Sequence, residues 1–159
     1  MNHTVHLYRE YDKINQIFKS YNHLYHKLAV FYDLSDSAID ILYALRWFKE
    51  PCTPTDITDF CCCSKQTIHS SLKKMEADGL LEISVSPQNK KNRIVQLTDK
   101  GNEIADRTVQ KIIDTEIRSF AALSEEERET LIAIQTKQLE AFRKETEALF
   151  NDKQGTEQK

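Results

Sequence analysis

The chain has 159 residues, of which 40% are hydrophobic and 30% charged, with only three Gly and three Pro. This length supports a core that needs no disulfide, and the composition favours a helix-rich protein over a disordered or an all-β one. The formal net charge of −3 hides a basic centre, because residues 64–97 carry six basic and three acidic side chains while both flanking segments are acidic.

No segment of the sequence resembles a membrane span or a signal peptide. The longest uncharged apolar stretch, residues 28–32, has five residues, far fewer than a bilayer requires. We therefore expect a cytoplasmic protein with no membrane association. Four cysteines, three of them adjacent, make a poor disulfide framework and suit a reducing compartment.

The first half of the chain is predicted to be helical. Apolar side chains recur at spacings of three and four over residues 5–32, which predicts one long amphipathic helix. Ser35 is a suitable N-cap for a second helix. Thr53, Pro54 and Asp56 predict the start of a short third helix, because they supply a hydroxyl N-cap, a proline at the first position and an acid at the third.

Ser64 is the next predicted N-cap, and Gly79 ends the helix that follows it. Within this helix Ile68, Leu72 and Met75 share one face at 100° per residue, and the opposite face is polar. One face is therefore expected to pack against the protein and the other to remain free.

After the glycine the apolar period changes from 3.6 to 2, since Leu81, Ile83 and Val85 alternate with polar residues. This alternation predicts a half-buried strand, and the polar turn 87–92 followed by residues 93–97 completes a hairpin with a basic tip.

Two further helices are predicted after the hairpin. Thr98 is expected to cap a single helix that continues to about residue 120, and Ser124 forms a capping box with Glu127 for the last helix. The predicted fold is mainly α, with the order α-α-α-α-β-β-α-α. The expected segments are an N-terminal helix (1–34), a central unit of helices and a hairpin (35–98), C-terminal helices (99–150) and a disordered tail (151–159).

Residues 53–97 combine a short helix, a tight turn, a second helix and a hairpin, which is the element order of a winged helix-turn-helix. A helix fits the major groove of double-stranded DNA, and basic side chains on a hairpin can bind the flanking backbone or the minor groove. The predicted DNA-binding residues are Ser64, Lys65, Gln66, Thr67, His69, Ser70 and Lys73 on the helix and Lys90, Lys91 and Arg93 on the hairpin.

Long amphipathic helices at both ends exceed what a winged unit needs. We expect residues 5–32 and 104–150 to form a homodimer that recognises a near-palindromic site, and an intramolecular bundle is the alternative. The expected domains are thus an N-terminal dimerisation helix (1–34), a winged helix-turn-helix DNA-binding domain (35–98) and C-terminal dimerisation helices (99–150).

Three short motifs stand out in this central segment: Ser-Lys-Gln-Thr-Ile at 64–68, Met-Glu-Ala-Asp-Gly-Leu-Leu at 75–81 and Leu-Thr-Asp-Lys-Gly at 97–101. Together they resemble the motifs of the MarR family. This resemblance implies a dimer, a pair of wings, and repression relieved by a small molecule or an oxidant. The sequence departs from the family pattern in two places, the wing and the recognition helix. Asn89 and Lys91 occupy the places of a wing Asp and Arg, and Ser70 that of a helix Arg.

Two smaller groups of residues are candidate sensors. Tyr21, Tyr25 and His26 are aromatic side chains with polar tips that suit a small aromatic effector, although packing explains them equally well. Cys61, Cys62 and Cys63 lie at the predicted helix-turn-helix turn, where redox sensing competes with simple packing as an interpretation. We expect no metal and no cofactor, because His26 and the nearby His23 have no evident third ligand.

The sequence contains no glycine-rich phosphate loop, no metal-spaced His/Cys set and no Ser-His-Asp arrangement, so we expect no enzyme. The predicted function is that of a sequence-specific transcription regulator, a repressor modulated by a small ligand. The alternatives are a dimeric ligand-binding or protein-interaction module that has lost DNA binding, and a cysteine-based redox-sensing regulator.

Overall fold

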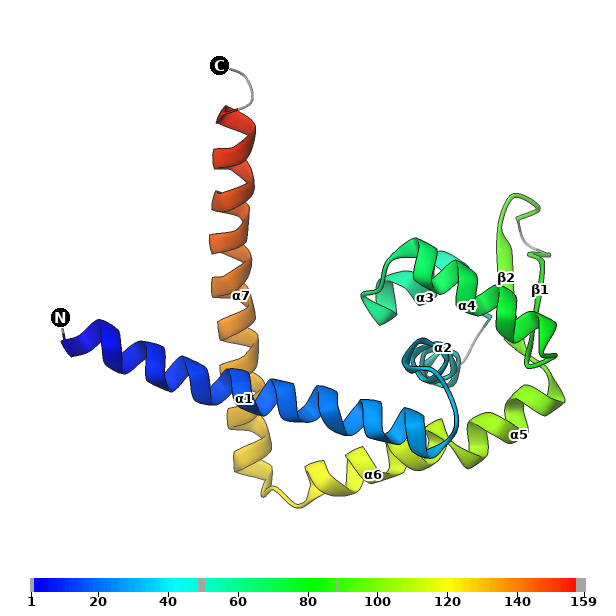
Figure 1. The fold of residues 1–159 in the computed structure, drawn as a ribbon, viewed down its shortest axis with the longest axis horizontal. Helices are drawn as coiled ribbons and strands as arrows, with labels where there is room; N and C mark the ends of the chain where they lie inside the picture. The colour runs from blue at the N-terminus through cyan, green and yellow to red at the C-terminus, as the bar shows by residue number, and fades with distance from the viewer. Residues whose placement is uncertain (1, 49–50, 88, 157–159) are drawn as a thin grey trace. The chain divides into compact units, whose positions relative to one another are not determined.

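The computed structural model describes residues 2–48, 51–87 and 89–156. The chain divides into two compact units, Met1–Asp114 and Thr115–Lys159. The described part contains seven helices and one antiparallel pair of strands, in the order α1–α4, β1, β2, α5–α7 (Figure 1). The expected fold class, mainly helical with a small hairpin, is confirmed. None of the described helices is long and apolar enough to cross a membrane.

The second, third and fourth helices begin at the predicted caps, and the first begins three residues before the predicted range 5–32. α1 is Asn2–Phe31 and α2 is Asp36–Trp47, with the Ser35 hydroxyl accepting from the Ala38 amide at 3.2 Å. α3 is Pro54–Cys61 and carries the complete capping box of Thr53 and Asp56. α4 is Lys65–Ala77, and the Ser64 hydroxyl accepts from the Thr67 amide at 3.1 Å. Local capping chemistry therefore sets these boundaries.

The core of the first unit is built around α2, which contacts α1, α3, α4 and α5. Ile41 and Leu42 of α2 are fully buried, as is Ile57 of α3. They meet the buried stripe of α4, which includes Ile68 and Leu72. The apolar face predicted for α4 is thus the face that packs against the core.

The hairpin consists of β1 (Leu81–Val85) and β2 (Arg93–Leu97), with Ile83 opposite Val95 in the antiparallel register. The expected alternation holds only at the base, since Leu81 is buried but Val85 is 55% exposed. The far half of the hairpin therefore extends beyond the core. At the outer edge of β2, the Val95 amide donates to the Cys52 carbonyl at 2.8 Å.

The single helix expected after the hairpin is divided into α5 (Asp99–Arg107) and α6 (Val109–Ala121). The break lies at Thr108, whose backbone is not helical (φ −118°, ψ −88°). Its hydroxyl donates to the Ile104 carbonyl at 2.7 Å, and such side-chain bonds compete with helical backbone pairing. The expected order therefore gains one helix.

α7 (Glu125–Thr156) begins at the predicted capping box, in which the Ser124 amide donates to the Glu127 carboxylate at 2.7 Å. The helix continues to Thr156, so residues 151–156 are helical where we expected a disordered tail. Residues 157–159 of that expected tail lie outside the described residues.

The two glycine-containing motifs contact each other at the end of α4. The Thr98 hydroxyl accepts from the Gly101 amide at 3.0 Å and donates to the Gly79 carbonyl at 2.7 Å. Gly79 has φ of +70°, a conformation that glycine adopts without strain. Gly101 lies so close to Leu80 that a Cβ there would be 1.8 Å from the Leu80 carbonyl oxygen. This contact joins α5 to the turn between α4 and the hairpin.

Replacing Gly101 should therefore be far more damaging than replacing Gly79. Gly101→Ala forces the backbone of Leu80 to move, and we expect it to lower the free energy of unfolding by about 3 kcal/mol. Gly79→Ala meets no atom within 4 Å and should cost about 1 kcal/mol through its left-handed backbone alone. Urea unfolding followed by circular dichroism measures both, and equal losses would contradict the close contact.

Candidate nucleic-acid interface

The position of α4 decides which of its side chains face outward. Ile68, Leu72 and Met75 are all at most 3% exposed, so the opposite face of the helix is directed away from the core. All seven residues predicted from the sequence to read DNA on this helix, Ser64, Lys65, Gln66, Thr67, His69, Ser70 and Lys73, are exposed.

Three of these seven are hydroxyl residues that are already engaged within the helix. Besides capping Thr67, the Ser64 hydroxyl lies 2.8 Å from the Thr67 hydroxyl. The Ser70 hydroxyl donates to the Thr67 carbonyl at 2.9 Å. Ser64 and Ser70 therefore have a structural task, and their capacity to donate to a base edge is reduced.

The other four side chains are available. Across the described residues, no hydrogen bond or ion pair engages the side chains of Lys65, Gln66, His69 or Lys73. Gln66 and His69 are three residues apart and so lie next to each other on the exposed face. An amide and an imidazole in this arrangement supply hydrogen-bond donors and acceptors of the kind that read base edges.

The tip of the hairpin is held by its own backbone and by two polar side chains. The Ser86 amide donates to the Asn92 carbonyl at 2.8 Å, and the Ser86 hydroxyl accepts from the Asn89 amide at 3.3 Å. The Asn89 side chain accepts from the Lys91 amide at 3.0 Å. Asn89 therefore braces the backbone of the turn at the position where the family pattern has an acid.

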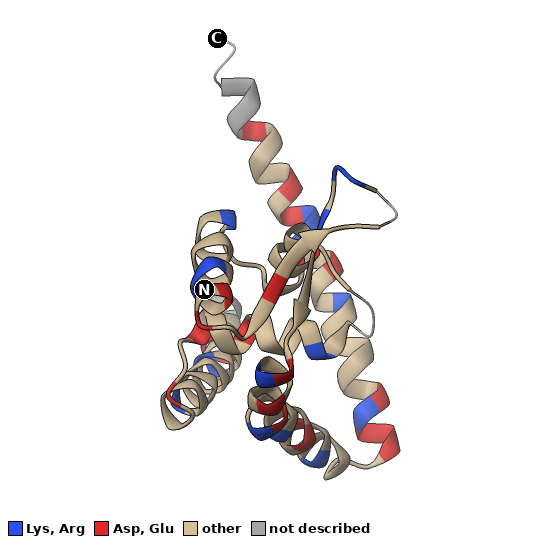
Figure 2. Cartoon of the chain, turned by 90° about the vertical axis from the view of Figure 1, so that its right-hand side faces the viewer, with Lys and Arg blue, Asp and Glu red and all other residues tan. Residues whose placement is uncertain are grey.

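This turn presents the predicted basic residues to solvent. Lys90, Lys91 and Arg93 are exposed, and basic positions appear in blue at the end of the hairpin (Figure 2). The neighbouring Gln88 lies outside the described residues. The hairpin thus carries cationic side chains on a segment that extends beyond the core.

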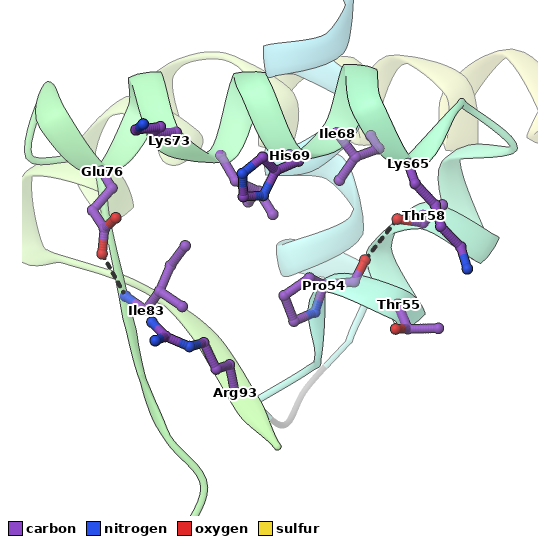
Figure 3. Close-up of a pocket in the computed structure, with 11 residues that line it drawn as sticks. Pro54, Thr55, Thr58, Lys65, Ile68, His69, Lys73, Glu76, Ile83 and Arg93 are labelled. Atoms are coloured by element: carbon purple, nitrogen blue, oxygen red, sulfur yellow. Dashed lines mark hydrogen bonds between the residues drawn. The ribbon is translucent and has the colours of Figure 1, made fainter. Parts of the chain in front are cut away.

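A groove of about 710 Å³ separates the exposed face of α4 from the hairpin and from α3 (Figure 3). Its lining combines apolar side chains with basic ones, and consists of Pro54, Thr55, Thr58, Lys65, Ile68, His69, Leu72, Lys73, Glu76, Ile83 and Arg93. Lys65, His69, Lys73 and Arg93, which were predicted separately on two elements, therefore border one surface.

Three polar residues that line the groove were not predicted from the sequence to be part of a site. Thr55 and Thr58 belong to α3, and their spacing of three residues was the available signal. Glu76 was known only as part of a motif, and its carboxylate accepts from the Ile83 amide at 3.3 Å.

A second, smaller cavity of about 260 Å³ lies between α1 and α2 and is lined by Asn22, Tyr25, His26, Asp36, Ile39 and Asp40. Two of the three residues of the predicted effector site, Tyr25 and His26, therefore line this cavity, and the third, Tyr21, does not. The His26 imidazole Nδ1 lies 3.0 and 3.1 Å from the two carboxylate oxygens of Asp36. Burial, and secondarily the charge of Asp36, raises the pKa of Asp40.

The three adjacent cysteines lie at the end of α3 and in the turn to α4: Cys61 is the last residue of α3, and Cys62 and Cys63 belong to the turn. Cys62 is exposed and adopts a left-handed backbone at the end of α3. Cys61 is partly buried, and this burial, with the charge of Asp40 as a smaller contribution, raises the pKa of its thiol to about 12. Burial likewise raises the pKa of Cys63. High thiol pKa values disfavour the thiolate form that reacts with oxidants.

Several known proteins are similar to this chain in sequence and in fold. A sequence profile of the MarR family matches residues 32–91. The HTH-type transcriptional regulator PecS of Dickeya dadantii (strain 3937) is 30% identical over 105 residues, which are 65% of this chain and 63% of PecS. The chain thus spans less than two thirds of this curated relative.

Solved structures extend the similarity to most of the chain. A MarR family transcriptional regulator from Silicibacter pomeroyi superposes with a TM-score of 0.64 at 25% identity, over 79% of this chain and 84% of that one. BpsR of Bordetella bronchiseptica, whose DNA binding is regulated by 6-hydroxynicotinic acid, superposes with a TM-score of 0.62 at 18% identity, over 80% and 90% of the two chains. The chain is therefore similar to MarR family regulators in sequence over residues 32–91 and in fold over about four fifths of its length.

Proposed function

We propose that this protein is a transcription regulator that binds double-stranded DNA through α4 and the hairpin. The observation that supports this most directly is the set of unengaged polar side chains on α4, next to a basic hairpin across one groove. An exposed helix face fits the major groove, and the hairpin lies where it can contact backbone on the flank of the same site. PecS is by its name an HTH-type transcriptional regulator, and BpsR binds DNA in a regulated way.

Within this interface we assign some side chains to base contacts and others to phosphate contacts. Gln66 and His69 read base edges, while Lys65 and Lys73 at the two ends of the exposed face bind phosphates. Lys90, Lys91 and Arg93 bind the flanking backbone or minor groove and release counterions. Because the family's helix Arg and wing Arg are Ser70 and Lys91 here, the preferred sequence is a property of this chain.

We propose that the protein acts as a homodimer through its terminal helices. α1 exposes a stripe that includes Leu7, Tyr11 and Ile17, each more than half exposed in the single chain. α7 exposes Phe142 and Leu149 to more than 60%. Apolar stripes of this length are unfavourable in water and are covered well by a second copy. A two-fold axis would set the two α4 helices about 34 Å apart on a near-palindromic operator.

We further propose that the cavity between α1 and α2 binds a small effector that modulates DNA binding. BpsR provides the precedent of an aromatic ligand. The volume of about 260 Å³ accommodates no more than a single ring. Because Asp36 and Asp40 line it, a neutral phenol or a cationic ring suits this cavity better than an aromatic carboxylate. Repression, relieved by such a ligand, and a cytoplasmic location complete the proposal.

DNA binding predicts distinct effects of helix and hairpin substitutions. Lys91→Ala should weaken binding to every duplex several-fold and lower the slope of log affinity against log salt by about one per protomer. Gln66→Ala should instead relax the preference at one base pair, by about 1–3 kcal/mol of discrimination. Selection from random duplexes, followed by titration of the selected sequence at several salt concentrations, measures both effects.

Lys137→Ala is the matched control, because Lys137 is an exposed lysine of α7 and should leave affinity and salt slope unchanged. If the unaltered protein binds no duplex even at low salt, the interaction-module alternative replaces the proposal.

The dimer predicts that a charge on the apolar stripe of α7 separates the copies. Phe142→Glu removes an apolar contact from both protomers and should raise the dimer dissociation constant roughly 10²–10³-fold. Lys144→Glu places the same residue on the opposite face of α7 and should leave the dimer intact. Sedimentation equilibrium compares the variants. A monomeric wild type at high micromolar concentration would refute the dimer.

The raised thiol pKa of Cys61 predicts that it does not sense oxidants. A raised pKa keeps the neutral thiol at pH 8, so iodoacetamide should alkylate Cys61 at least about a hundredfold more slowly than a free small thiol. Mass spectrometric sequencing of the peptide that spans residues 50–65 separates Cys61 from Cys62. Rapid alkylation of Cys61, or a loss of DNA affinity in dilute peroxide, would favour the redox-sensing alternative.

A further inference from the structure

The free edge of β1 carries a backbone donor whose direction follows from the strand register. The Ser86 amide pairs with the Asn92 carbonyl, and the Thr98 amide with the Leu80 carbonyl at 3.2 Å. In an antiparallel pair, residues alternate between pairs that exchange hydrogen bonds and pairs that do not. Ile83, opposite Val95, belongs to the second kind. Its amide therefore points away from β2.

Glu76, in the last turn of α4, supplies the acceptor for this amide. Its carboxylate reaches across the end of the groove to the Ile83 nitrogen at 3.3 Å (Figure 3). Among the described residues, this is the hydrogen bond that joins residues 65–77 of α4 to residues 81–97 of the hairpin. A charged acceptor makes such a bond stronger than a neutral one.

The bond lies at the point where the hairpin leaves the core. Leu81 is buried and the Ile83 side chain is half-buried, but Val85, two residues further, is exposed. The opposite edge of the hairpin is held at the same level, because Val95 faces Ile83 and bonds to Cys52. Beyond this level, the described hairpin has only its own internal hydrogen bonds to hold it.

The negative charge of Glu76 calls for an explanation, because this side chain lies in a groove whose other charged lining residues are basic. Residues 64–97 contain three acids, and Glu76 is the one that lines the groove beside Lys73 and Arg93. A carboxylate near DNA phosphates opposes binding. Solvation alone explains an acid on a polar surface, but it does not explain a contact with a strand-edge amide seven residues away.

We propose that Glu76 is a positioning residue that fixes the hairpin relative to α4 and so sets the spacing between the base-reading and backbone-binding surfaces. This inference rests on the proposed DNA binding for its functional part. The anchor itself is a property of the free protein.

The experiment compares Glu76→Ala, Glu76→Gln and a control, Glu82→Ala. Glu82 is an exposed acid on β1 whose removal changes the net charge equally. Glu76→Gln removes the charge but keeps an oxygen that accepts from Ile83, so it tests whether the hydrogen bond is sufficient.

The first measurement is amide hydrogen exchange by NMR on the free protein. Glu76→Ala should speed exchange of the Ile83 amide about tenfold, with little change at Leu72 in the middle of α4. Glu76→Gln should restore most of the protection, and Glu82→Ala should resemble the wild type. Unchanged exchange of Ile83 in Glu76→Ala would overturn the anchor.

The second measurement is affinity for a selected duplex. Glu76→Ala should bind about five- to tenfold more weakly despite losing a negative charge, whereas Glu76→Gln and Glu82→Ala should bind at least as tightly as the wild type. In a Lys90→Ala/Lys91→Ala/Arg93→Ala background the loss caused by Glu76→Ala should vanish, because the three basic residues of the hairpin no longer contribute. A loss that persists in that background would overturn the positioning role. If the wild type binds no duplex, the proposed function fails while the exchange measurement still decides the anchor.

Discussion

The burial of Ile68, Leu72 and Met75 against the core around α2 is the constraint on which the rest of the interface depends. Each buried side chain of this size contributes about 1.5–3 kcal/mol. That free energy fixes the rotation of α4 about its axis. Once the rotation is fixed, the outward direction of Gln66 and His69 follows from helix geometry alone.

The contacts around the end of α4 then place the neighbouring elements. The close approach of Gly101 to Leu80, with the Thr98 hydroxyl between Gly79 and Gly101, joins the end of α4 to the start of α5. Arg46 of α2 adds a second link to α5 through the Asn102 carbonyl at 3.0 Å and the Asp106 carboxylate. The hairpin between α4 and α5 is therefore anchored at its base, while its tip extends free.

Hydrogen bonds within α4 and within the hairpin turn engage some of the exposed polar side chains and leave others available. Ser64 and Ser70 look like readers of DNA in the sequence, but their hydroxyls bond within α4. Asn89 likewise bonds the backbone of its own turn. Among the described residues, Lys65, Gln66, His69 and Lys73 of α4 have side chains without an internal hydrogen bond, and the proposed recognition of DNA rests on them and on the exposed basic residues of the hairpin.

The sequence by itself determined the elements, their caps and the polar face of α4, because apolar periodicity and N-cap hydrogen bonds act over fewer than five residues. It also indicated the family, through motifs that prove to contact one another. Apolar spacing did not predict the break at Thr108 or the continuation of α7 past Asn151. The tertiary structure alone decided that Tyr25 and His26, but not Tyr21, line the cavity between α1 and α2.

It also revealed the bond from Glu76 to Ile83. The bond and the lining of the cavity depend on which atoms meet between separate elements, and the apolar spacing along the chain does not encode these contacts. Spacing along a chain specifies which face of an element is apolar, but only packing specifies what that face meets.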